Sequence, residues 1–119
     1  MSHDTPMNES DIQARLARDL PQWEYREGWI RRHYKTAGWP HTLMLVNAIG
    51  YMAEAAFHHP DLSVSYAMVD VKLMTHSAKG ITDKDLELAK KIESAVTWLP
   101  EAGSSLEGFE KGFGKKWTR

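Results

Sequence analysis

The sequence predicts an α+β domain in which helices cover one face of a four-stranded antiparallel sheet, in the order α-β-β-α-β-β-α. Two pairs of short segments alternate apolar and polar residues around tight turns, which is typical of β-hairpins. Three further segments carry apolar residues at helical spacing and flank or separate these hairpins. Helices and hairpins that alternate along so short a chain favour a two-layer sandwich.

Composition excludes several classes of function. The chain has 119 residues, the size of one domain, and its 15 Lys and Arg residues nearly balance 16 Asp and Glu residues. No basic field would therefore attract nucleic acid or an anionic membrane. Cysteine is absent, which excludes disulfides and thiol chemistry. With neither a secretory signal nor a run of roughly 18 apolar residues, we expect a cytoplasmic protein with small-molecule or protein partners.

The domain is expected to span residues 10–100. Residues 1–9 are polar and are predicted to be disordered. Residues 101–119 are rich in Gly and Lys, and we interpret them as a flexible surface tail. The positive charge of this tail comes from Lys111, Lys115, Lys116 and Arg119.

A short helix and a hairpin come first. Ser10 is a suitable N-cap for the helix, whose apolar residues recur every four positions until Pro21 ends it. These apolar residues are Ile12, Leu16 and Leu20. Segments 23–25 and 29–35 are rich in aromatic and β-branched residues, which predicts two strands with a turn at Glu27-Gly28.

The second predicted helix begins at a Thr42 cap, extends to about Phe57 and is apolar nearly all round. One side of such a helix packs on its own sheet, so the surplus apolar side indicates a second partner surface. We therefore expect a homodimer or homotetramer through the 42–57 helix. Asn47 and Gly50 interrupt the apolar surface, and a close approach of a partner backbone at Gly50 would explain both. Pro60 ends this segment.

The second hairpin and the last helix complete the domain. Segments 62–66 and 69–75 alternate in a way that predicts one buried face, with Tyr66 on that face. His76 is predicted on the polar side of the second strand, near the end of that strand, where it could reach solvent or a ligand. Thr82-x2-Asp85 resembles a capping box ahead of a helix that Pro100 ends.

Histidine and carboxylate residues recur at fixed offsets between residues 54 and 85. Their order is Glu54-x3-His58-His59-Pro60-x5-Tyr66-x9-His76-x8-Asp85. A free histidine has a pKa of roughly 6.5, which suits proton transfer near neutral pH. Glu54 and His58 are four residues apart at a helix end and share one face, so the carboxylate would orient that imidazole. The adjacent His59 must point in another direction.

This set of residues resembles the signature of pterin-4a-carbinolamine dehydratases, and the resemblance extends over roughly residues 10–99. The family dehydrates 4a-hydroxytetrahydropterin to quinonoid dihydropterin, and its fold is the one predicted above. The resemblance implies that the substrate is a reduced pterin and that no metal or organic cofactor is needed. It implies these site residues: His58 and His76 as acid and base, Glu54 as an orienting or polarising group, and His59, Pro60 and Asp85 on the substrate-binding side.

Other interpretations of these residues stay open. Asp85 is a helix cap in the simplest interpretation, Tyr66 a core aromatic, and His3, His33 and His41 surface residues. Zinc binding is disfavoured, because the ligands would be adjacent and the chain lacks an HExxH pair. The family usually carries Phe-x-Phe-x-x-Phe where this chain has its 33–40 segment, at the substrate-side wall and oligomer edge. The alternative function is therefore a non-catalytic binding protein, like relatives that are dimerisation cofactors for transcription factors or RuBisCO assembly factors.

Overall fold

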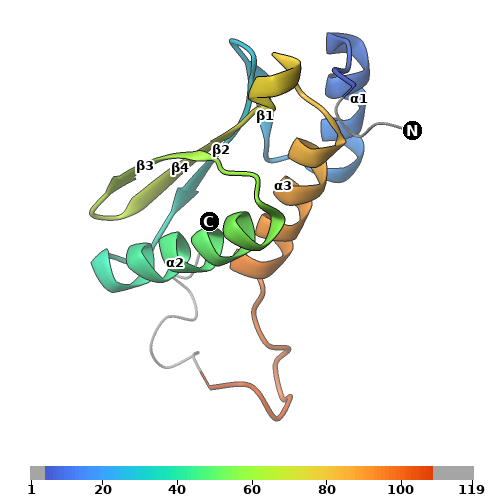
Figure 1. The fold of residues 1–119 in the computed structure, drawn as a ribbon. Coiled ribbons are helices and arrows are strands. Elements are labelled where there is room, and N and C mark those ends of the chain that lie inside the picture. The colour runs from blue at the N-terminus through green and yellow to red at the C-terminus, as the bar shows by residue number, and fades with distance from the viewer. Residues whose placement is uncertain (1–4, 109–119) are drawn as a thin grey trace.

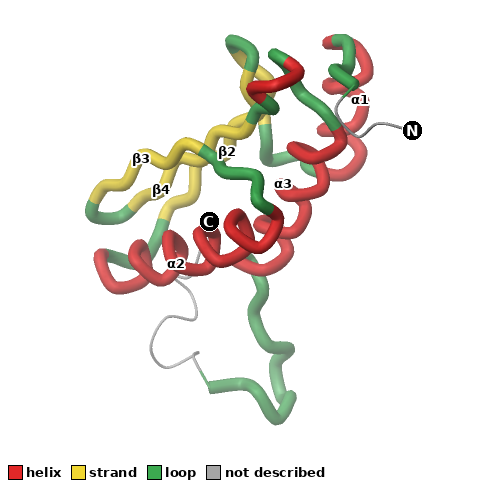
Figure 2. Tube along the Cα trace, in the orientation of Figure 1, coloured by secondary structure: helices red, strands yellow, loops and turns green. Residues whose placement is uncertain are grey.

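A four-stranded antiparallel sheet with helices on one face forms the domain, as the computed structural model shows for residues 5–108 (Figure 1). The strand order in the sheet is β1-β2-β4-β3, so the two hairpins meet at the central pair β2 and β4. Figure 2 shows how the helical and extended segments alternate along the chain. The fold class and the order of elements predicted from the sequence are confirmed. The bounds are α1 Glu9–Asp19, β1 Glu24–Arg26, β2 Trp29–Lys35, α2 Trp39–Ala56, β3 Asp61–Ser65, β4 Met68–Leu73, the 3₁₀ turn η1 His76–Ala78 and α3 Asp83–Val96.

The core lies between the sheet and the helices. Strand β4 buries every second residue, and β2 places Ile30 and Tyr34 on the same side. Helix α1 contributes Ile12 and Leu16 from one stripe, as its four-residue spacing predicts. The fully buried residues of β4, α2 and α3 that meet there are Val69, Val71, Leu73, Ile49, Leu86, Ala89 and Ile92.

The turn between β1 and β2 is confirmed at Glu27-Gly28. Both residues have positive φ, at 54° and 85°, and Arg26 pairs with Trp29 across the turn. Two consecutive positive φ angles match the right-handed twist of a hairpin, and a glycine at the second position adopts this conformation without strain. The turn brings Trp29 to the first position of β2.

The first helix begins earlier than predicted. Its N-cap is Asn8, whose side-chain oxygen accepts a hydrogen bond from the N–H of Asp11 at 2.8 Å, so the expected cap at Ser10 is wrong. The N–H of Met7 also donates to the carbonyl of Ile81 at 2.8 Å, which ties residues 5–8 to the domain. Of the segment predicted to be disordered, residues 1–4 lie outside the described part of the chain, together with His3.

Helix α2 begins at Trp39 and not at the predicted Thr42 cap. Gly38 is its N-cap, at φ 140°, and Pro40 occupies the first turn. Thr42 lies inside the helix, where its hydroxyl donates to the carbonyl of Tyr66 at 2.8 Å. Thr42 therefore joins α2 to the β3–β4 turn.

Tyr66 is 70% exposed, so the prediction of a core aromatic is wrong. Strand β3 ends at Ser65, and Tyr66 belongs to the turn that follows. The alternation of apolar and polar residues no longer applies once the strand has ended.

The capping box that begins α3 is confirmed. The Thr82 side chain accepts from the backbone of the first turn, and the Asp85 side chain accepts from the Thr82 N–H at 2.9 Å. The helix ends at Val96 with Thr97 as its C-cap, three residues before Pro100. The basic residues of the predicted tail, from Lys111 onward, lie outside the described residues. None of the helices within residues 5–108 has the length and apolarity needed to span a membrane.

A buried polar cluster around Glu93 joins α3 to the sheet. The Glu93 carboxylate accepts hydrogen bonds from Arg32 Nε at 2.9 Å, Tyr34 Oη at 2.6 Å and Trp23 Nε1 at 2.8 Å. Burial alone would raise the pKa of Glu93, but these hydrogen bonds outweigh burial and lower it. Burial, together with the hydrogen bond to Glu93, raises the pKa of Tyr34. Arg32 is only 8% exposed, and the Glu93 carboxylate stabilises its buried charge.

Candidate active site

The end of α2 sets the directions of His58 and His59. Helix α2 stops at Phe57, which adopts the left-handed conformation at φ 48°, and the N–H of His58 then donates to the Ala53 carbonyl at 3.0 Å. This turn removes His58 and His59 from the helical register. The His58 side chain points inward and is 13% exposed, whereas that of His59 is 52% exposed.

His58 forms a short hydrogen bond with Asp85. Its Nε2 lies 2.6 Å from Oδ1 of Asp85, which is fully buried at the start of α3. The second carboxylate oxygen, Oδ2, accepts from Thr75 Oγ1 at 2.7 Å and from the Thr82 N–H at 2.9 Å. Because a carboxylate accepts but does not donate, the proton of the pair lies on Nε2 of His58. Nδ1 of His58 is then the ring nitrogen that Asp85 does not engage.

His59 pairs with Glu54 at the surface. Nε2 of His59 lies 2.8 Å from Oε1 of Glu54, and the Phe57 ring packs edge-on against the imidazole, with ring centroids 5.3 Å apart. The sequence predicted that Glu54 would orient His58, and that prediction is wrong. The four-residue rule requires continuous helix, and the left-handed Phe57 interrupts the helix between the two residues.

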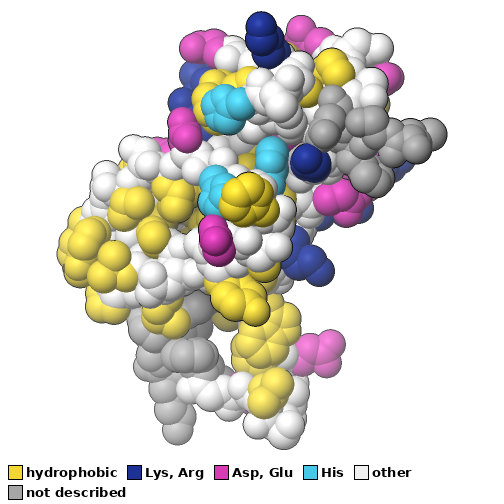
Figure 3. Space-filling model, viewed as in Figure 1, with side chains coloured by type: hydrophobic (Ala, Val, Ile, Leu, Met, Phe, Trp, Pro, Cys, Tyr) yellow, Lys and Arg dark blue, Asp and Glu magenta, His cyan; other side chains and the backbone are white. Residues whose placement is uncertain are grey.

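His76 lies on the 3₁₀ turn η1, which follows β4 in the chain. The turn is closed at its base by the bridge between Thr75 and Gly80. The His76 side chain is exposed, and its ring meets the Trp29 ring edge to face, with centroids 5.7 Å apart and an interplanar angle of 79°. Figure 3 shows histidine side chains gathered with acidic and apolar groups on one face of the molecule. Thr75 joins the two parts of the site, since it precedes His76 and binds Asp85.

Comparison with known proteins identifies the family of the chain. A family model described as pterin 4 alpha carbinolamine dehydratase matches residues 5–95, a range that includes His58, His59, His76 and Asp85. The chain belongs to this family. A protein of Aquifex aeolicus named "Putative pterin-4-alpha-carbinolamine dehydratase" is 43% identical over 90 residues, covering 76% of this chain and 90% of that protein. A protein of the same name from a Picosynechococcus species is 40% identical over 85 residues, covering 71% of this chain and 91% of that protein.

A solved structure shares the fold. A crystal structure described as a transcriptional coactivator/pterin dehydratase from Brucella melitensis superposes with a TM-score of 0.71 at 29% sequence identity. The likeness covers 76% of this chain and 97% of that chain. The part of the present chain beyond the family match is thus mainly the segment after α3.

Within this dehydratase-family domain, a groove of about 610 Å³ opens between α2 and α3 beside His58. Its walls are largely apolar, with Tyr51 and Met52 from α2 and Leu88 from α3. Sequence reasoning did not find this groove, although the surplus apolar side of the 42–57 helix was a signal for it. The groove therefore places an apolar surface beside His58.

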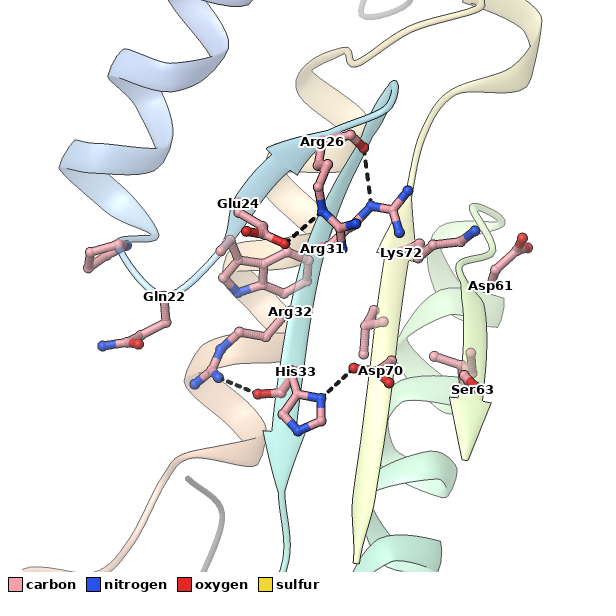
Figure 4. A pocket seen from close by; sticks show the side chains of 14 residues that line it. Gln22, Glu24, Arg26, Arg31, Arg32, His33, Asp61, Ser63, Asp70 and Lys72 are labelled. Atoms are coloured by element: carbon pink, nitrogen blue, oxygen red, sulfur yellow. Dashed lines mark hydrogen bonds and ion pairs between the residues drawn. The ribbon is translucent and has the colours of Figure 1, made fainter. Parts of the chain in front are cut away.

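A larger cavity of about 920 Å³ lies on the open face of the sheet, away from the helices (Figure 4). Several of its charged side chains bind one another. His33 Nδ1 lies 2.6 Å from Asp70 Oδ1, and Arg26 Nε donates to Glu24 Oε1 at 3.2 Å. His58 and His76 do not line this cavity, so it is separate from the dehydratase-like site.

The remaining predicted residues divide between the site and the rest of the domain. Pro60 is half-buried between the histidine pair and β3. His33 is exposed as expected, but His41 is fully buried, and its Nδ1 accepts from the Ala37 N–H at 2.9 Å. Burial lowers the pKa of His41. Among residues 5–108, no group of three or more His, Asp or Glu side chains is arranged to hold a metal ion.

Proposed function

We propose that this protein dehydrates a 4a-hydroxytetrahydropterin to the quinonoid dihydropterin and water, with histidines as general acid and base. The observation that carries the proposal is the buried pair of His58 and Asp85. It leaves one imidazole nitrogen available and supplies a carboxylate that stabilises the imidazolium form. Family membership supports the substrate class, because its name specifies a pterin carbinolamine.

The proposed reaction needs one proton acceptor and one proton donor. The bond between C4a and the hydroxyl oxygen breaks, the oxygen takes the electron pair and a proton, and water leaves. The N5–H bond gives up its proton, and its electrons form the N5–C4a double bond. The pair with Asp85 holds the His58 ring with Nδ1 available, so we assign the N5 proton to His58. The exposed His76 delivers the proton to the departing hydroxyl, and no metal or organic cofactor enters the proposal.

The other predicted residues have supporting roles in this proposal. His59, held by Glu54 at 2.8 Å, contacts the pterin ring system from the solvent side. Pro60 keeps the histidine pair rigid, because a proline restricts the residue before it. Asp85 acts through His58 and does not touch the substrate, since it is fully buried.

Stopped-flow absorbance of 4a-hydroxytetrahydropterin decay tests the proposal. The wild type should accelerate decay over the spontaneous reaction, while His58→Ala and His76→Ala should each lose about 10²-fold or more of that acceleration. His33→Ala is the matched control, because His33 is exposed and paired with a carboxylate but lies on the open face of the sheet. Wild-type decay at the rate of buffer alone would refute the proposal.

We also propose that copies of this chain associate through α2. This helix exposes large apolar side chains, among them Leu43 at 40%, Met44 at 42% and Tyr51 at 77%. A Cβ at Gly50 would meet no atom within 4 Å, so Gly50→Leu leaves the protomer unchanged while obstructing a partner at this surface. Sedimentation should show a smaller assembly for Gly50→Leu than for Ala17→Leu, which adds the same side chain to the exposed face of α1. Equal sedimentation of both variants would exclude this interface.

A non-catalytic binding protein is the second candidate function. The exposed apolar residues favour it, as does the Brucella melitensis protein described as a transcriptional coactivator. Dimerisation of a transcription factor or assembly of RuBisCO would use such a surface and would not need proton transfer. In that case the doubly substituted His58→Ala, His76→Ala protein would retain all partner binding, and the wild type would show no dehydratase activity.

A further inference from the structure

His76 is held differently from the other two histidines of the site. His58 and His59 each place a ring nitrogen within 2.8 Å of a carboxylate oxygen. Among residues 5–108, the His76 ring has no hydrogen-bond partner, and it stands on a turn of only three residues. Its ring contact is with Trp29, at a centroid distance of 5.7 Å and an angle of 79°. An aromatic contact therefore takes the orienting role that carboxylates have for His58 and His59.

Trp29 is itself fixed from two directions. Its backbone is the first residue of β2 and pairs with Arg26 across the tight β1–β2 turn. The ammonium group of Lys72 lies over the Trp29 ring, with Nζ 4.4 Å from the ring centroid. Lys72 belongs to β4, where Figure 4 shows it beside Arg31 of β2, its cross-strand partner. The two central strands of the sheet thus hold the indole that meets His76.

We propose that Trp29 is a positioning residue for His76 and that Lys72 fixes the Trp29 ring; the catalytic part of this inference rests on the proposed function. An exposed imidazole on a short turn would otherwise populate several χ1 rotamers. Proton transfer requires the ring to be held within about 0.5 Å and 10–20° of its productive geometry. The edge-to-face contact with Trp29 selects one orientation of the His76 ring. The pairing of β2 with β4 in turn fixes the position of Trp29.

Nuclear magnetic resonance tests the positioning without any substrate. The His76 ring protons, assigned by their loss in His76→Gln, should be displaced from random-coil positions by the indole ring current. Trp29→Leu should return them to random-coil positions, Trp29→Phe should retain part of the displacement, and Lys72→Met should reduce it. Trp98→Leu and Lys35→Met are matched controls that remove an exposed tryptophan and an exposed lysine away from this contact.

Kinetics test the consequence for catalysis. Trp29→Leu should lower kcat by roughly 2- to 12-fold, the range expected from one aromatic ring pair, with KM within about twofold of wild type. Trp29→Phe should recover most of the loss. In the His76→Gln background, Trp29→Leu should cause no further decrease in kcat, because the residue that it positions is already absent. A purely structural role would instead lower kcat equally in both backgrounds.

Each outcome decides a separate point. Unchanged His76 shifts in Trp29→Leu would overturn the positioning role, and an equal loss of kcat in the His76→Gln background would overturn the catalytic role. If the wild type does not accelerate pterin dehydration, the proposed function fails together with the catalytic role of Trp29. The magnetic resonance measurement still decides in that case whether Trp29 orients His76.

Discussion

Replacing Asp85 with asparagine should separate the two roles of this side chain. The substitution keeps the size of the group but exchanges one acceptor oxygen for an NH₂ donor. In the wild type, Oδ1 accepts from His58 and Oδ2 accepts from Thr75 and from the Thr82 N–H. An amide at this position satisfies the Thr82 N–H with its oxygen and then presents NH₂ to His58.

The expected loss of activity follows from the tautomer of His58. A donor facing Nε2 requires that nitrogen to be unprotonated, which moves the ring proton to Nδ1 and blocks the nitrogen that would accept the substrate proton. The corresponding exchange in Ser-His-Asp hydrolases lowers kcat about 10⁴-fold. We expect a loss of about 10²- to 10⁴-fold here, because the second histidine retains its own function.

The stability cost should be moderate. The capping hydrogen bond to Thr82 persists, while charge-assisted hydrogen bonds to His58 and Thr75 weaken, each worth about 1.5–3 kcal/mol when lost completely. A decrease of about 1–3 kcal/mol in the free energy of unfolding is expected, read from urea titration.

Stopped-flow kinetics measure the loss of activity, and ¹⁵N shifts of the His58 ring report its tautomer. Glu54→Gln is the matched control, because it makes the same exchange in the exposed pair with His59, where stability should change by less than about 1 kcal/mol. An Asp85→Asn protein that keeps the wild-type tautomer of His58 and kcat within about threefold would refute the reasoning.

Three further substitutions test other parts of the fold. His41 Nδ1 accepts a hydrogen bond from the Ala37 N–H, and burial lowers the pKa of His41. The unfolded chain therefore binds a proton at His41 more readily than the folded chain, and the free energy of unfolding falls as the pH drops below about 6.5. The advantage of wild type over His41→Asn in unfolding free energy should therefore narrow between pH 7.5 and 5.5, by at most about 1.4 kcal/mol per pH unit, whereas a constant gap would contradict a neutral, buried imidazole. Glu93→Gln leaves the Arg32 charge buried without its carboxylate and should cost about 3–5 kcal/mol in thermal or urea unfolding, and a cost below 1 kcal/mol would show that solvent replaces the pair. Gly38→Ala should cost about 1–3 kcal/mol, because Gly38 has φ 140° and ψ −172°, a region open essentially to glycine alone, and an unchanged melting temperature would argue against that conformation.

Local signals in the sequence were sufficient for most of the fold. The glycine turn after Glu27 and the capping box at Thr82 are stabilised by neighbours in sequence, and both lie where they were predicted. The wrong predictions have a different cause. Thr42 resembles a cap, but its hydroxyl binds the Tyr66 carbonyl from a distant turn. No sequence pattern specifies that tertiary contact.

The site shows the same division. The three histidines and Asp85 were identified from their spacing, and their catalytic roles stay predictions. The predicted partner of His58 was wrong: Asp85 binds His58, and Glu54 binds His59 instead. The left-handed conformation of Phe57 directs His58 away from Glu54, and a phenylalanine gives little signal for such a conformation. The Trp29 contact depends on how the hairpin lies against the 3₁₀ turn, which sequence spacing does not reveal.

The burial of Asp85 bears on how loss of catalysis would be recognised in proteins of this fold. Its carboxylate caps the start of α3 and also holds His58, so a chain without dehydratase activity would still lose stability if Asp85 were replaced. The presence of Asp85 in a chain therefore indicates a requirement for stability as much as for catalysis. Exposed groups such as His76 and His59 carry no comparable folding constraint and are free to change once proton transfer is no longer required. In a descendant that has lost catalysis, substitutions should therefore appear first at His76 and His59, and not at His58 and Asp85.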